Sequence, residues 1–80
     1  MQLIRRIDAI ETRASKLSLS LCEVCRGAGE QYSTVWRWRR PGANPQHNTV
    51  ERVLSALERH LDKQERHLRR ALARRERLSA

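Results

Sequence analysis

Aromatic residues, cysteine, proline and glycine are all scarce in this sequence, and each shortage argues against a class of protein. The 80 residues contain two tryptophans, one tyrosine and no phenylalanine, together with two cysteines, two prolines and three glycines. Two cysteines are too few for a disulfide framework, which is typical of a reducing compartment such as the cytoplasm. Long apolar runs are also missing, whereas a membrane-spanning helix needs roughly 18 such residues. We therefore expect one small cytoplasmic domain that has no membrane partner and little room for a deep catalytic pocket.

Basic residues are abundant, and arginine accounts for nearly all of them. Seventeen Lys and Arg stand against nine Asp and Glu, a formal net charge of +8, and 15 of the 17 are arginine. Such an excess attracts phosphate, in nucleic acid or on an anionic membrane surface. The planar guanidinium binds two phosphate oxygens at once, which favours phosphate recognition over a role in solubility alone. The position of the charge along the chain must decide between these two roles.

Two helices are predicted in the N-terminal third of the chain. Apolar residues recur at steps of three and four between residues 3 and 17, which predicts an amphipathic helix with one buried stripe. Ser20 and Glu23 then form an S-x-x-E capping box, which marks the start of a second helix. This helix must be short, because Gly27 and Gly29 follow within about two turns. The residues of the first stripe are Leu3, Ile4, Ile7, Ile10, Ala14 and Leu17.

Two further helices are predicted after these. The third spans about residues 31–40 and is stopped by Pro41, and a loop follows up to residue 47. Asn48 is expected to cap the fourth, with Glu51 three residues later, and neither glycine nor proline interrupts the rest of the chain. The expected fold class is therefore all-α, a compact bundle of four to five helices with a helix-turn-helix and a long C-terminal helix.

The second and third helices have the layout of a DNA-binding helix-turn-helix, in which a glycine-containing turn leads into a basic second helix. Cys25 and Ala28 supply small side chains where the two helices cross. Gly29 tolerates the positive φ that the turn requires. Val35 and Trp38 lie three residues apart and are expected to anchor the second helix in the core.

This segment resembles the lambda repressor/Cro-like (XRE-type) helix-turn-helix family, and the resemblance extends over residues 18–60. Two positions depart from the family pattern. Glu30 follows the turn glycine, where the family usually has an apolar residue. Gln31 stands where a serine or threonine often caps the recognition helix, and glutamine is a poor cap.

The resemblance also implies which residues meet duplex DNA. In the family, the first turn of the recognition helix and the residues one turn later reach base edges in the major groove. Arg37 would then donate two hydrogen bonds to a guanine, and Tyr32 or Trp36 would contact a thymine methyl group. Phosphate contacts position the protein without reading sequence. The expected base contacts are Tyr32, Ser33, Trp36 and Arg37, and the expected phosphate contacts are Gln31, Arg39, Arg40, Arg69 and Arg70.

Cys22 and Cys25 form a C-x-x-C pattern, which invites a zinc or redox interpretation. Zinc needs four ligands, and the three histidines of the chain do not have the usual spacing to complete the set. A redox C-x-x-C belongs beside a βαβ pattern, which this sequence lacks. We therefore expect Cys25 in the core and Cys22 near the surface. We expect no metal, no cofactor, no small-molecule ligand and no enzymatic activity.

The C-terminal part combines an apolar heptad seam with strong positive charge. From Val50 onward the seam positions alternate by four and three, with two polar interruptions. Residues 63–77 carry seven basic and two acidic groups, a net charge of +5. We therefore separate a helix-turn-helix domain, residues 1–62, from a basic helical extension, residues 63–80. The extension is expected to dimerise, to contact DNA phosphates, or to remain a solvated tail.

These features predict a small transcriptional regulator, a repressor of the phage or mobile-element type that the resemblance implies. One recognition helix reads too few base pairs for useful specificity, so we expect a homodimer on a palindromic operator. Its half-sites would lie about one helical turn apart. Two alternatives remain open. One is an adaptor that binds a partner protein through the C-terminal helix, and the other is an RNA-binding protein that uses the arginine-rich tail.

Overall fold

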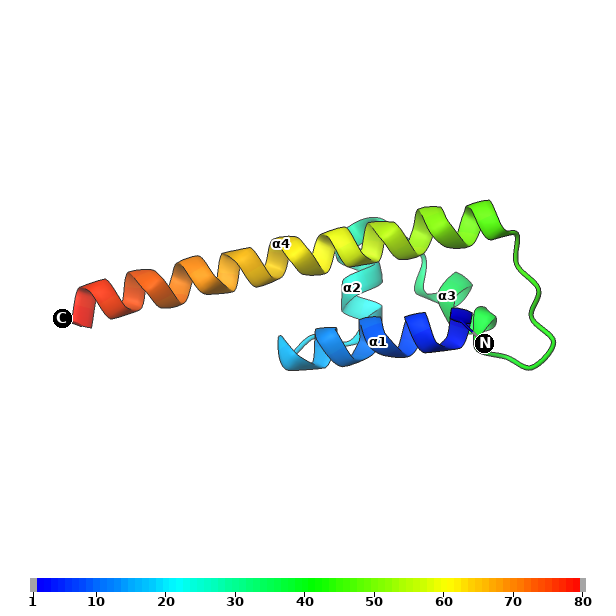
Figure 1. The fold of residues 1–80 in the computed structure, drawn as a ribbon, viewed down its shortest axis with the longest axis horizontal. Helices are drawn as coiled ribbons and strands as arrows, with labels where there is room; N and C mark the ends of the chain where they lie inside the picture. The colour runs from blue at the N-terminus through cyan, green and yellow to red at the C-terminus, as the bar shows by residue number, and fades with distance from the viewer. Residues whose placement is uncertain (1, 80) are drawn as a thin grey trace.

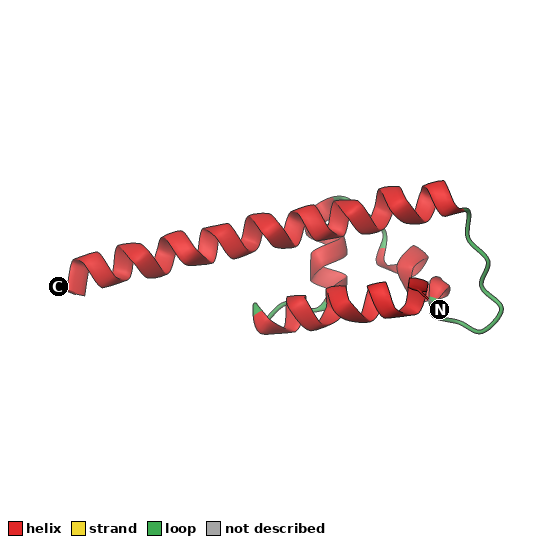
Figure 2. Cartoon of the chain, in the orientation of Figure 1, coloured by secondary structure: helices red, strands yellow, loops and turns green. Residues whose placement is uncertain are grey.

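The computed structural model describes residues 2–79, and this part of the chain forms four helices without any strand (Figure 1, Figure 2). The predicted all-α class with a long C-terminal helix is confirmed. The second half of the last helix projects beyond the other three, so the Cα atoms extend 55 Å along one axis and 18 Å along the other two. The helices are α1 (Gln2–Lys16), α2 (Leu21–Ala28), α3 (Tyr32–Trp38) and α4 (His47–Ser79).

The four helices form two layers. α1 and α4 lie side by side, and α2 and α3 lie behind them, where the ribbon of Figure 1 is paler. α2 packs against both α1 and α4, whereas α3 packs against α1 and α2. None of the helices in residues 2–79 is both long and apolar enough to cross a bilayer.

The start and end of α2 follow directly from the sequence. The Ser20 hydroxyl accepts a hydrogen bond from the Glu23 amide at 3.1 Å, and the Glu23 carboxylate accepts one from the Ser20 amide at 2.9 Å. The bond from the Ser20 amide lowers the pKa of the Glu23 carboxyl, because it stabilises the charged form of that carboxyl. Gly29 ends the helix in the left-handed region at φ 78°. The predicted capping box and glycine turn are therefore confirmed.

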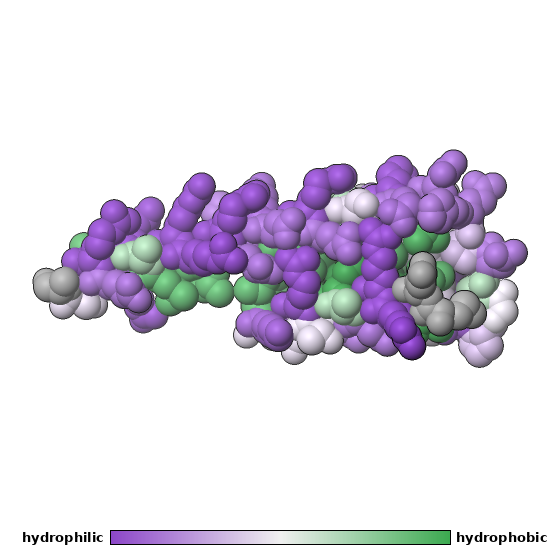
Figure 3. All heavy atoms as spheres, in the orientation of Figure 1, coloured by the Kyte–Doolittle hydropathy of each residue, from purple (hydrophilic) through white to green (hydrophobic). Residues whose placement is uncertain are grey.

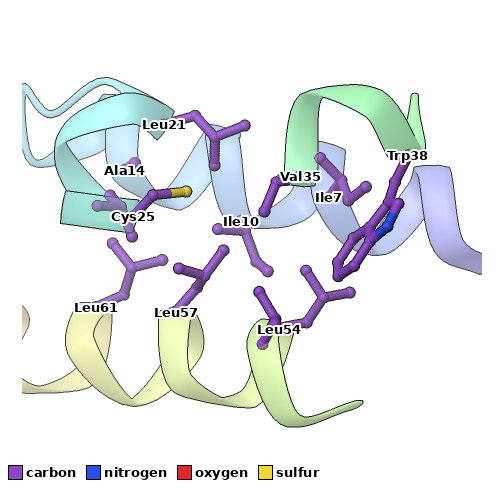
Figure 4. Close-up of a cluster of buried hydrophobic side chains, with 12 residues drawn as sticks. Ile7, Ile10, Ala14, Leu21, Cys25, Val35, Trp38, Leu54, Leu57 and Leu61 are labelled. Atoms are coloured by element: carbon purple, nitrogen blue, oxygen red, sulfur yellow. The ribbon is translucent and has the colours of Figure 1, made fainter. Parts of the chain in front are cut away.

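Every helix contributes side chains to one apolar core, which the close-up of Figure 4 shows between α4 on one side and α1, α2 and α3 on the other. The stripe predicted on α1 is correct for Ile7, Ile10 and Ala14 but wrong for Ile4, which is 39 % exposed. Ile4 lies at the opposite edge of the stripe from Ile10. The core residues are Ile7, Ile10, Ala14, Leu21, Val24, Cys25, Val35, Trp38, Val53, Leu54, Leu57 and Leu61.

Two predicted helix boundaries are wrong by about two residues. α4 begins at His47, directly after Pro45 and Gln46, and the Val50 amide donates to the Gln46 carbonyl at 3.1 Å. Asn48 therefore lies inside the first turn and does not cap the helix. α3 ends at Trp38, and the next two residues continue as a turn.

Ion pairs on the outside of the core tie α1 to α4. The Arg6 guanidinium donates to Glu58 at 2.8 Å and also to Glu51, and Arg13 donates to Asp62 at 2.7 Å and to Glu65. These carboxylates raise the pKa of both arginines above the ordinary value. The fold thus neutralises Arg6 and Arg13 internally.

No helix boundary separates residues 1–62 from the extension, because α4 is continuous through this point and only burial ends there, at Leu61.

Candidate nucleic-acid interface

α3 has one buried face and one exposed face. Val35 is fully buried and Trp38 is 7 % exposed, so the predicted anchors do hold the helix in the core. Tyr32 and Trp36 on the other face are 38 and 45 % exposed. Ser33 and Arg37 are exposed on this face as well, so the structure brings the four residues expected to contact bases together on one short helix.

The turn before α3 contains Glu30 and Gln31, the two positions at which the sequence departs from the pattern of the family that it resembles. Glu30, half-buried, pairs with Arg52 of α4 at 3.2 Å, so a carboxylate takes the place of an apolar contact. Gln31 occupies the N-cap position and its side chain caps nothing, as its poor capping ability suggests. Its exposed amide therefore stands at the start of α3, where we expect it to donate to a phosphate.

Arg37 and Arg40 give the exposed face of α3 its positive charge. Arg40 lies over the Trp36 ring, with its guanidinium carbon 4.7 Å from the ring centroid, a cation–π contact. The Arg37 side chain reaches back to the Ser33 carbonyl at 3.4 Å. Among residues 2–79, neither arginine lies in a salt bridge with a carboxylate. Both charges are therefore available to an anionic partner.

Arg39 is expected from the sequence to contact phosphate, but in the structure its guanidinium is already paired with carboxylates. Its guanidinium donates to Asp8 at 3.0 Å and to Glu11 at 2.8 Å, both on α1. The bond to Glu11 raises the pKa of Arg39. Arg39 makes these bonds because it directly follows the buried Trp38 and therefore lies beside α1, where the two carboxylates are within reach. We therefore correct its role to a tie between α1 and the end of α3.

Arg69 and Arg70 lie on the projecting half of α4, and the structure does not bring them together with α3. Arg69 has Glu65 at 3.9 Å, one turn before it, and Arg70 is exposed. Arg70 belongs to a line of basic residues that sequence reasoning did not single out, although their steps of three, four and seven residues were the available signal. We call this line the α4 ridge. Its members are Arg52, Arg59, Lys63, Arg66, Arg70, Arg74 and Arg77.

The two cysteines are free thiols in different environments. Cys25 is fully buried in the core, and burial raises the pKa of its thiol to about 11. Cys22, three residues earlier, is half-buried. Among the described residues no group of three or more His, Cys, Asp or Glu is placed to hold a metal ion. Cys25 thus occupies a core position and Cys22 a position nearer the surface of α2, as expected from the sequence.

We expect the two thiols to react at very different rates. Near pH 8, a thiol-specific reagent should modify Cys22 of the folded protein, because its side chain is accessible. Cys25 should react only on unfolding, because it is both enclosed and protonated. Mass spectrometry after timed labelling, with a Cys22→Ser variant as control, measures this. Rapid modification of Cys25 in that folded variant would contradict the packing of α2.

Comparison with known protein families, with curated proteins and with solved structures found no match. The interpretation of the exposed face of α3 therefore depends on its own geometry and chemistry. The exposed face has the width of a single helix and carries aromatic, hydroxyl and guanidinium groups. α3 itself contains no carboxylate.

Proposed function

We propose that this protein is a sequence-specific, double-stranded DNA-binding transcriptional regulator, a repressor that acts in the cytoplasm as a homodimer and has no catalytic role. The observation that carries the proposal is the exposed face of α3. A short helix anchored by Val35 and Trp38 presents Ser33, Trp36 and Arg37 outward. The Gly29 turn joins this helix to α2, which is the layout of a helix-turn-helix.

The dimensions and the chemistry of α3 both suit the major groove. The groove is about 12 Å wide and admits an α-helix, and each base pair presents a distinct pattern of donors and acceptors there. Arg37 supplies a bidentate donor for guanine, and the rings of Tyr32 and Trp36 supply apolar contacts for thymine methyl groups. Gln31 and Arg40, at the two ends of α3, supply the phosphate contacts that hold it in position.

Selection of bound sequences from random duplex DNA tests the proposal most directly. A palindromic motif would support specific recognition and two-fold symmetry together, whereas a lack of any enrichment would overturn the proposal. Binding should also weaken steeply as the salt concentration rises, because phosphate neutralisation releases counterions. An adaptor that binds a partner protein through apolar helix contacts would show little salt dependence.

Arg40 and Arg39 provide a matched pair, adjacent in sequence but different in environment. Arg40→Ala should weaken binding to all duplexes alike and reduce the salt slope by about one, because it removes one phosphate contact. Arg39→Ala should leave the salt slope nearly unchanged, since Asp8 and Glu11 already neutralise this guanidinium. Titrations at several salt concentrations compare the two variants. A larger loss of slope for Arg39→Ala would contradict the assignment of these two side chains.

Removal of residues 63–80 is a single control that tests the RNA-binding alternative, because this segment carries most of the α4 ridge. Leu61 is the last residue of α4 that is buried in the core, so a chain without residues 63–80 should retain α3 and its base contacts. Such a truncated chain should still prefer the selected duplex over random duplex, although with lower affinity. Complete loss of this preference, together with tight binding of structured RNA by the full chain, would favour an RNA-binding function instead.

A further inference from the structure

The projecting half of α4 has an apolar face that no other part of the described chain covers. Leu61 is fully buried in the core, but Leu68 and Leu72, which continue the same face, are 44 and 48 % exposed. Leu78 is 81 % exposed. Figure 3 shows an apolar patch along one side of the projecting helix, opposite a row of hydrophilic side chains. Leucines repeated along one face of an otherwise charged helix mark a contact surface.

We propose that this face binds the same face of a second copy of the chain, with the two α4 extensions antiparallel and centred close to Leu72. The proposal rests on the proposed function, which requires a homodimer, and it assigns the interface. In this register Leu72 meets the partner's Leu72, and Leu68 packs on the aliphatic part of the partner's Arg75. The α4 ridge stays on the opposite, solvent-facing side, where the two sets of positive charge are farthest apart.

The charges that border the apolar face favour the antiparallel arrangement. Arg69 and Glu76 are seven residues apart and therefore lie on the same edge of the face. A two-fold axis perpendicular to both helices places each edge of one helix beside the same edge of the other. Arg69 then comes opposite the partner's Glu76, and Glu76 opposite the partner's Arg69. Parallel helices would place this edge beside the opposite edge and lose both pairs.

A hollow at the end of α1 gives Leu78 a place in the same arrangement. The hollow has a volume of about 310 Å³ and is lined by Leu17, Leu19, Gln64, His67 and Leu68. Leu78 lies eleven residues after His67, three helical turns, and so projects from the same edge of α4. In the antiparallel register the partner's Leu78 reaches the level of Gln64 and His67, beside this hollow. The most exposed leucine of the chain thereby acquires apolar neighbours.

This dimer also determines how the two α3 helices face DNA. The two-fold axis is perpendicular to the plane of α1 and α4, so both copies keep α2 and α3 on the same side (Figure 1). The pair between Glu30 and Arg52 places the start of α3 beside Arg52 on α4. From Arg52 to the centre at Leu72 is 20 residues, so the two α3 helices start about 60 Å apart. At 3.4 Å per base pair this separation is about 18 base pairs, which is longer than the one-turn spacing expected from the sequence.

The mass of the protein in solution, measured without DNA over a range of concentrations, tests the interface apart from the proposed function. Sedimentation equilibrium should show the 9.4 kDa chain associating to twice that mass. Leu72→Glu should weaken dimerisation more than about tenfold, because it buries an unpaired carboxylate. Ala73→Glu, the same new charge one residue along and off the apolar face, should change it little. A wild-type protein that stays monomeric, or equal effects of the two variants, would overturn the proposal.

A charge exchange tests the antiparallel register. Arg69→Glu should weaken the dimer, because it faces the partner's Glu76, and the double variant Arg69→Glu/Glu76→Arg should restore it. Failure of the double variant to restore dimerisation would overturn the register. The spacing of half-sites in selected duplexes, expected at about 18 base pairs, is a separate readout. A stable dimer that selects no DNA would leave this interface in place and contradict the proposed function alone.

Discussion

Leu57→Ala is expected to destabilise the protein by about 3 kcal/mol, within the 2–5 kcal/mol usual for a buried leucine. Leu57 is fully enclosed and lies at the centre of the core, beside Ile10 and Leu61 (Figure 4). A domain of this size has a total free energy of unfolding of only about 4–12 kcal/mol. The variant should therefore show a much lower midpoint in urea.

Leu72→Ala is the matched control, since it makes the same change on the same helix at a side chain that is 48 % exposed. In dilute solution, where the protein is monomeric, its effect on stability should stay within about 0.5 kcal/mol. Urea unfolding followed by circular dichroism at low protein concentration compares the two variants. Similar losses of stability would mean that the projecting half of α4 is packed as tightly as the core, contrary to the structure.

Arg37→Ala is expected to relax base specificity, the second large effect. A bidentate contact to guanine contributes about 1–3 kcal/mol of discrimination, so preference at one position of the selected motif should fall by a factor of about 5–150. The stability of the fold should change little, because the Arg37 side chain is exposed and makes only a 3.4 Å contact to the Ser33 carbonyl. Selection with the variant protein, followed by titration on single-base variants of the motif, measures both quantities.

Arg5→Ala is the control for this experiment, because it removes an equal charge from an exposed position on α1 instead of α3. It should lower affinity slightly and equally for every duplex. If Arg37→Ala changed neither affinity nor preference, α3 would not be the helix that reads the bases. If both variants reduced affinity without altering preference, α3 would contact DNA through its charge alone.

The candidate site could be predicted from the sequence to the extent that it depends on local periodicity. Val35 and Trp38, three residues apart, had to share one face of a short helix, so Ser33, Trp36 and Arg37 had to lie off that face. Arg39 could not be predicted in this way. Its neighbours in sequence are a buried tryptophan and another arginine, and only the packing of α1 against α3 brings Asp8 and Glu11 within reach.

The sequence by itself determined the helices and their ends wherever a local signal was strong. The Ser20–Glu23 capping box starts α2 and Gly29 ends it, because these interactions are made within one or two turns of chain. The tertiary structure alone decided which charges remain available. Arg6, Arg13 and Arg39 meet carboxylates that are 28 to 52 residues away in sequence, and no local pattern encodes such pairs. It also left Leu68 and Leu72 exposed, because α1 ends before it can cover that part of α4.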